Sequence, residues 1–142
     1  MKSTKRKTLT KKLLLGVVAT LILFSFGSCT KKNEFLPSTV TPAATGYVKV
    51  KKDKNNNYVI NIRISNLAAV ESLQQSKSTY VVWMETDQQA TENLGQVKSS
   101  KKLNVTFETV SSSKPVKIFI TAEEDGSDDF PGKQVVLSTN EL

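Results

Sequence analysis

The chain of 142 residues contains no histidine, and it contains a single cysteine and a single tryptophan. The absence of histidine removes the commonest general base and the commonest zinc ligand. One cysteine cannot form a disulfide within the chain. The longest apolar run, Leu13 to Phe26, is shorter than the stretch of about 20 residues that a membrane-spanning helix usually needs. These shortages argue against histidine-dependent catalysis, a disulfide-stabilised scaffold and a permanent transmembrane anchor.

Positive charge is abundant but unevenly placed. The formal net charge is +7, from 20 basic and 13 acidic side chains. Six of the basic residues precede Cys29, in a stretch without any acid, and the remainder has 14 bases against 13 acids. A basic patch that binds nucleic acid has to belong to the folded part of a protein. We therefore expect no nucleic-acid partner.

Residues 1–28 have the layout of an export signal. A basic stretch, MKSTKRKTLTKK, precedes an apolar stretch, LLLGVVATLILFSF, and the small residues Gly27 and Ser28 precede Cys29. The ending FGSC resembles the lipobox of bacterial lipoproteins, with Phe26 where that motif usually has leucine. The resemblance implies that the Cys29 thiol takes a diacylglyceryl group and that Cys29 becomes the mature N-terminus. The alternative is an incidental thiol at the end of an uncleaved transmembrane helix.

If Cys29 is lipidated, we expect the protein to be anchored in a bacterial membrane through that lipid. It would lie in the cell envelope outside the cytoplasm, either in the periplasm or at the cell surface. Acylation would add the two or more chains that stable anchoring requires. The stretch 29–45 is rich in Thr, Ser, Pro and Ala and has no apolar periodicity. It predicts a flexible linker, in which Phe35 and Leu36 are the large apolar residues that could dock on a domain.

From residue 46 to the C-terminus, apolar and polar residues alternate with the period of two that is typical of β-strands. YVKVKK and YVINIRIS flank the turn sequence DKNNN and predict a hairpin. TYVVWMET, NLGQVKS, KLNVTFETV, PVKIFITAE and KQVVLST follow, and NLAAVESLQQSKS predicts a helical turn. About seven short strands predict an all-β fold, an immunoglobulin-like antiparallel β-sandwich over residues 46–142.

Three segments of this domain, TYVVWMET, NLGQVKS and ITAEEDGSDDFPGKQVVL, resemble in their order the C-terminal domain of the anti-sigma-K factor family. The shared features are a Tyr-x-x-Trp strand, a glycine before a short strand, a Thr-x-Glu motif and a proline ahead of the closing strand. They correspond here to Tyr80, Trp83, Gly95, Thr121, Glu123 and Pro131. The resemblance implies an extracytoplasmic sandwich in which these residues have structural roles.

The chain departs from that family before the sandwich. In the family, a transmembrane helix connects the sandwich to a helical domain that holds a sigma factor, and here a lipoprotein signal stands in its place. We therefore expect no direct contact with a sigma factor. The resemblance implies the fold, an envelope location and a sensory or scaffolding role. We expect another envelope protein as the partner.

Two serine-rich turns place hydroxyls beside lysines. Lys77 lies between Ser76 and Ser78, and Lys114 follows Ser113. Sequence neighbours on a turn point in different directions, so we interpret both turns as solvated loops and expect no Ser–Lys catalysis. With no histidine and a lipidated cysteine, we expect no enzymatic activity.

The acidic stretch EEDGSDD supplies oxygen ligands of the kind that Ca²⁺ prefers. Its spacing does not match the DxDxDG calcium loop, so Asp125, Asp128 and Asp129 are only weak metal candidates, and we expect no cofactor. Trp83 is either an anchor in the core, which we favour, or an exposed platform for a sugar ring. The sequence thus predicts a membrane-anchored binding, sensory or scaffold domain, and the alternative is a glycan-binding or glycan-acting envelope protein.

Overall fold

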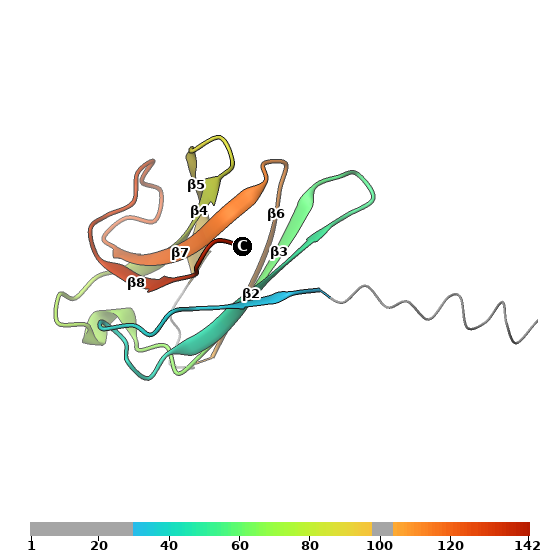
Figure 1. Ribbon diagram of the computed structural model, residues 1–142. Coiled ribbons are helices and arrows are strands. Elements are labelled where there is room, and N and C mark those ends of the chain that lie inside the picture. The colour runs from blue at the N-terminus through green and yellow to red at the C-terminus, as the bar shows by residue number, and fades with distance from the viewer. Residues whose placement is uncertain (1–29, 98–103) are drawn as a thin grey trace, which may run out of the picture.

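The computed structural model describes residues 30–97 and 104–142, and the export signal and Cys29 lie outside the described residues. Within these ranges the protein has eight strands in two antiparallel sheets, which form a β-sandwich (Figure 1). The helical element in these ranges is one 3-10 turn, η1 (Val70–Ser72). No helix in the described part of the chain is long and apolar enough to cross a membrane.

The strand order is that of an immunoglobulin-like sandwich. The first sheet has the order β1-β2-β3-β6 and the second has the order β5-β4-β7-β8. The chain changes sheets after β3, β5 and β6, as it does in immunoglobulin-type folds. The strands are β1 (Lys32–Glu34), β2 (Thr45–Lys52), β3 (Tyr58–Ser65), β4 (Thr79–Thr86), β5 (Thr91–Val97), β6 (Val105–Ser111), β7 (Pro115–Glu123) and β8 (Val135–Ser138).

The main core lies between the sheets and is built from the alternate positions that the sequence pattern indicates. Branched aliphatic residues dominate it, because they pack well on a pleated sheet. The residues of η1 and its flanks close one end of the core with three apolar side chains, in agreement with the predicted helical turn. The central residues are Val48, Ile60, Ile62, Ile64, Leu67, Val70, Leu73, Tyr80, Val82, Met84, Ile118 and Ile120.

The hairpin predicted around DKNNN is present between β2 and β3. The Asp53 carboxylate accepts hydrogen bonds from the backbone N–H groups of Asn55 (2.7 Å) and Asn57 (2.9 Å). Asn56 has a positive φ of 64°, a conformation that asparagine tolerates better than most residues. The asparagine cluster therefore fixes the turn, and the turn fixes the register of the two strands.

The flexible linker expected over 29–45 is wrong for the part that the structure describes. Lys32–Glu34 form β1 at the edge of the first sheet, and Phe35 then bridges to Thr139 beside the second sheet. The backbone N–H of Leu36 donates to the Ser138 carbonyl oxygen at 2.8 Å. A three-residue strand is too short to show an alternating pattern. The sandwich therefore begins at Lys32, three residues after Cys29.

Candidate functional site

The second sheet has a buried apolar cluster on its outer face, away from the main core. Alternate residues of β4 and β7 form it: Val81, Trp83 and Phe119. The rings of Trp83 and Phe119 are stacked, with centroids 6.5 Å apart. Trp83 is fully buried, as the favoured interpretation predicted, but it lies outside the main core. A buried indole cannot serve as a platform for a sugar ring.

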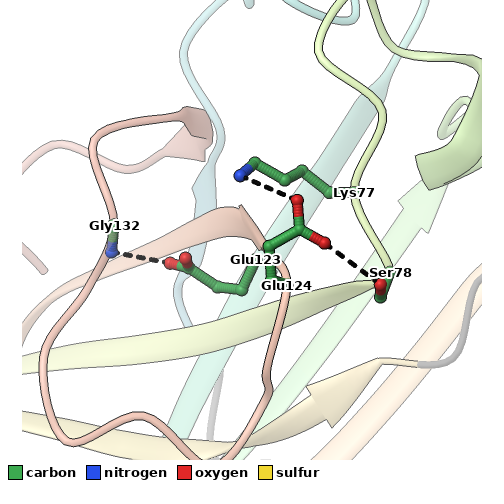
Figure 2. A network of polar contacts seen from close by, with 5 residues as sticks. All are labelled: Lys77, Ser78, Glu123, Glu124 and Gly132. Carbon is green, nitrogen blue, oxygen red and sulfur yellow. Dashed lines mark hydrogen bonds and ion pairs between the residues drawn. The ribbon is translucent and has the colours of Figure 1, made fainter.

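A chain of hydrogen bonds connects Trp83 to the segment between β7 and β8, residues 124–134, which we call the β7–β8 loop. The indole Nε1–H of Trp83 donates to Thr121 Oγ1 at 2.8 Å, and the Thr121 hydroxyl donates to Glu123 Oε1 at 2.5 Å. The same carboxylate oxygen accepts the backbone N–H of Gly132 at 2.7 Å (Figure 2). Glu123 is 6% exposed. A buried carboxylate needs hydrogen-bond donors, and the Thr121 hydroxyl and the Gly132 N–H supply them.

Asn93 holds the other part of the β7–β8 loop against β5. Its Nδ2 donates to the carbonyl oxygens of Gly126 (3.1 Å) and Asp128 (3.0 Å), and its Oδ1 accepts the Gly95 N–H (2.9 Å). Gly95 has a φ of 131°, at a register shift where β5 has one residue more than β4. Glycine adopts such a conformation without strain. The bulge therefore orients Asn93 toward the loop.

These contacts bring together most of the residues singled out by the family resemblance. Trp83, Thr121 and Glu123 form one network, and Pro131 directly precedes the glycine that closes it. Gly95 supports the same loop through Asn93. A side chain at Gly132 would overlap the Glu123 carboxylate. These hydrogen bonds hold the β7–β8 loop on the outer face of the second sheet.

Tyr80, the sixth of these residues, lies on the opposite face of β4, in the main core. Its hydroxyl donates to the Ala68 carbonyl oxygen at 2.9 Å, which ties the η1 segment to β4. Burial, and secondarily the negative charge of Glu71, raises the pKa of Tyr80 to about 12. The buried phenol therefore stays protonated and serves the fold.

Neither serine-rich turn forms a Ser–Lys pair in the described residues. Lys77 and Ser78 both contact Glu124, whose carboxylate oxygens lie 3.2 Å from the Lys77 Nζ and 3.3 Å from the Ser78 Oγ (Figure 2). The Ser113 hydroxyl donates to Glu92 Oε1 at 2.6 Å. In both turns a serine hydroxyl next to the lysine is therefore hydrogen-bonded to a carboxylate.

The acidic residues of the β7–β8 loop do not converge. Asp125 Oδ1 accepts the backbone N–H of Ser127 at 2.9 Å and its hydroxyl at 2.7 Å, and these two hydrogen bonds lower the pKa of Asp125. Within residues 30–97 and 104–142, no three Asp, Glu, Cys or His side chains lie where they could hold a metal together. The structure therefore does not join Asp125, Asp128 and Asp129 into a site.

Phe130 is the one feature of the loop that sequence reasoning missed. Its side chain is 82% exposed, more than any other large hydrophobic residue in the described part of the chain. It lies between the segment held by Asn93 and the Gly132 N–H held by Glu123, so the loop is anchored on both sides of it. The signal in the sequence was an aromatic residue inside the polar turn SDDFPG.

The arrangement is suited to binding through a surface. The loop, held by these hydrogen bonds, exposes one aromatic side chain, and its acidic residues Glu124, Asp125, Asp128 and Asp129 are exposed as well. No family model, curated protein or solved structure matches the chain. The resemblance to the anti-sigma-K factor domain therefore remains a prediction from the sequence.

Proposed function

We propose that this chain is a bacterial envelope lipoprotein whose sandwich is a non-catalytic binding module. Cys29 carries the lipid and holds the domain at a membrane outside the cytoplasm. The β7–β8 loop binds another envelope protein, and through that contact the domain acts as a sensor or scaffold. The lipidation rests on the FGSC sequence and the binding on the geometry of the loop.

The observation that carries the binding proposal is the exposure of Phe130 on an anchored loop. When an exposed phenylalanine enters a partner's pocket, its apolar surface is removed from water, which contributes about 2 kcal/mol or more to the binding free energy. A loop that is already held by Glu123 and Asn93 loses little conformational entropy on binding. Aromatic anchors of this kind are typical of the residues that dominate binding energy.

The charge around Phe130 defines the partner's chemistry. Four exposed acidic residues of the same loop precede Phe130 in the sequence, and one basic residue of the loop, Lys133, follows it and is also exposed. Complementary charge steers association and excludes wrong partners. The expected partner is therefore a protein with an apolar pocket that is rimmed by lysine or arginine.

The test of this surface is site-specific photo-cross-linking in living cells. A photoreactive phenylalanine analogue replaces Phe130 in one strain and Val110 in another, because Val110 is also exposed (55%) but lies on β6 of the first sheet. We expect a discrete protein adduct from position 130 and none from position 110. Phe130→Ala in the unlabelled protein, used as competitor, should no longer suppress that adduct. Equal adducts from both positions would contradict the proposal.

The lipid anchor is tested separately by metabolic labelling. Cys29→Ala should abolish incorporation of radioactive palmitate and leave the precursor uncleaved. Cys29→Ala combined with the cross-linker at position 130 shows whether binding needs the anchor. Palmitate labelling that persists in Cys29→Ala would contradict the lipoprotein assignment without bearing on the loop.

A further inference from the structure

The charges of the domain are segregated between its two sheets, although they almost cancel in the sequence. The first sheet and its connections, residues 30–65 and 104–111, have seven basic and three acidic side chains, a net charge of +4. The other described residues, 66–97 and 112–142, have four basic and ten acidic side chains, a net charge of −6. A nearly neutral total therefore conceals a basic half and an acidic half.

Six lysines of the basic half gather at the end of the sandwich where the described chain begins. Lys32 pairs with Lys49 in antiparallel strands, so residues 30 and 31 run toward the end of β2 and its turn to β3 (Figure 1). Thr30 lines a surface hollow together with Lys49 and Lys51. We call the six residues the basic end: Lys31, Lys32, Lys49, Lys51, Lys52 and Lys54.

The ammonium groups of the basic end are not neutralised within the described residues. The two ion pairs of the described residues, Lys77–Glu124 and Lys117–Glu85, both join side chains of the acidic half. The acid nearest in sequence, Asp53, accepts hydrogen bonds from the backbone of its own turn. Lys32 and Lys52 instead lie over the rings of Tyr47 and Tyr58, with Nζ atoms 4.7 Å and 5.1 Å from the ring centroids. These amphipathic rings are of the type that is enriched at membrane interfaces.

The distance from the lipid attachment point is short. Three residues lead from Cys29 to Lys32, and a fully extended chain of that length spans at most about 11 Å. The Debye length at physiological ionic strength is about 8 Å. A lipid on Cys29 would therefore hold Lys32, at one edge of the basic end, at a distance comparable to the range over which headgroup charges act.

We propose that the basic end binds the surface of a membrane that contains anionic lipids. This rests on the proposed lipidation of Cys29, which supplies the hydrophobic part of the attachment. A cluster of four to eight lysines beside an anchor is typical of binding to phosphate-bearing headgroups. The acidic half is repelled by the same surface, so the domain is oriented with its β7–β8 loop away from the headgroups.

The test is lysine footprinting on the full-length protein purified from the membrane and reconstituted into vesicles. One set of vesicles is phosphatidylcholine alone, and the other contains about one third phosphatidylglycerol. An amine-reactive reagent labels exposed lysines, and mass spectrometry quantifies each. We expect the six lysines of the basic end to react at least about threefold more slowly on the anionic vesicles. Adding 0.5 M salt should reverse this protection, because salt shortens the Debye length and screens the headgroup charges.

Lys77, Lys114, Lys117 and Lys133 of the acidic half are the internal controls, and their reactivity should be the same on both vesicles. Lys51→Gln, Lys52→Gln and Lys54→Gln together should restore labelling of Lys32, whereas Lys114→Gln with Lys133→Gln should not. Equal labelling of the basic end on both vesicles would overturn the proposal. So would protection on phosphatidylcholine that rises with protein density, because that result indicates contact with the acidic half of a second copy.

The intact mass of the same sample reports separately whether Cys29 carries acyl chains. An unmodified mass would overturn the proposed lipidation and leave the lysine comparison readable. An acylated protein without lysine protection would overturn the membrane contact alone. The two proposals therefore fail in distinguishable ways.

Discussion

The indole Nε1–H of Trp83 and the Thr121 hydroxyl are hydrogen-bonded at 2.8 Å on the outer face of the second sheet. An outer face is normally wet, yet Trp83 is 0% exposed. The Thr121 hydroxyl continues to Glu123, which in turn holds the backbone of Gly132. The buried indole and the β7–β8 loop are therefore connected through one chain of hydrogen bonds.

Glu123→Ala should release the loop and expose the indole. The substitution removes the acceptor of two hydrogen bonds and leaves the Thr121 hydroxyl and the Gly132 N–H unpaired, which costs about 2–3 kcal/mol. Trp83 is the single tryptophan, so acrylamide quenching of its fluorescence reports the opening directly. We expect quenching to rise and the emission to shift to the red. Glu123→Gln, which keeps an acceptor oxygen, should have a smaller effect.

Glu108→Ala is the matched control, because Glu108 is an exposed acid on β6 of the first sheet. It should leave the acrylamide quenching of Trp83 unchanged and the free energy of unfolding within about 0.5 kcal/mol of the parent. If Glu123→Ala leaves Trp83 as protected as Glu108→Ala does, the loop is not what covers the indole.

The period-two pattern was sufficient to predict the sandwich, but two features depend on contacts that no local pattern reports. β1 has three residues and is defined by its pairing with β2, so the polar composition of its surroundings favoured a linker instead. The position of the β7–β8 loop depends on Asn93 reaching Gly126 and Asp128, more than 30 residues away. The same limit applies to charge, because a net value does not say which sheet carries which residues.

Gly95→Ala should destabilise the domain by about 1–3 kcal/mol, because a side chain at a φ of 131° is strained. Space is not the obstacle, since a Cβ there would meet the Phe107 ring at an ordinary 3.5 Å. Gly126→Ala is the comparison. Its Cβ would overlap the Gln96 side chain, which is flexible and can move aside. Urea unfolding should therefore rank Gly95→Ala as the costlier change, and the reverse order would show that the strain at the bulge is relieved.

Tyr80 should make the domain sensitive to alkali. Burial, with a smaller contribution from the Glu71 charge, raises the pKa of Tyr80 from 10.0 to about 12. A raised folded-state pKa means that its stabilising contribution is complete below pH 10 and is lost as the pH rises toward 12. Unfolding followed between pH 9 and pH 12 should show this loss. Tyr80→Phe cannot ionise and should remove that part of the pH dependence.

At neutral pH, Tyr80→Phe should cost about 1 kcal/mol, because the hydrogen bond to the Ala68 carbonyl oxygen is lost while the ring remains. Glu71→Gln tests the secondary cause: without that negative charge the pKa of folded Tyr80 is lower, so the alkaline loss should be slightly smaller and should end at a lower pH. An identical alkaline profile for the parent and Tyr80→Phe would assign the loss to another group.

The turn between β2 and β3 should make a contribution that is sensitive to acid. Desolvation alone would raise the pKa of Asp53, but the N–H groups of Asn57 and Asn55 and the Asn57 side chain outweigh it, so the pKa is lowered below 3.8. A depressed folded-state pKa gives stability that is present above about pH 4 and is lost as the pH falls through the folded value. Asp53→Asn keeps an acceptor oxygen for the turn but cannot titrate. It should therefore flatten the fall in stability between pH 5 and pH 2, measured by urea unfolding.

Asp87→Asn is the control, because the exposed Asp87 carboxylate accepts no hydrogen bond within the described residues. Its stability should follow that of the parent over the same pH range. Parallel acid limbs for the parent and Asp53→Asn would contradict the role of the ionised carboxylate in fixing the hairpin beside the basic end.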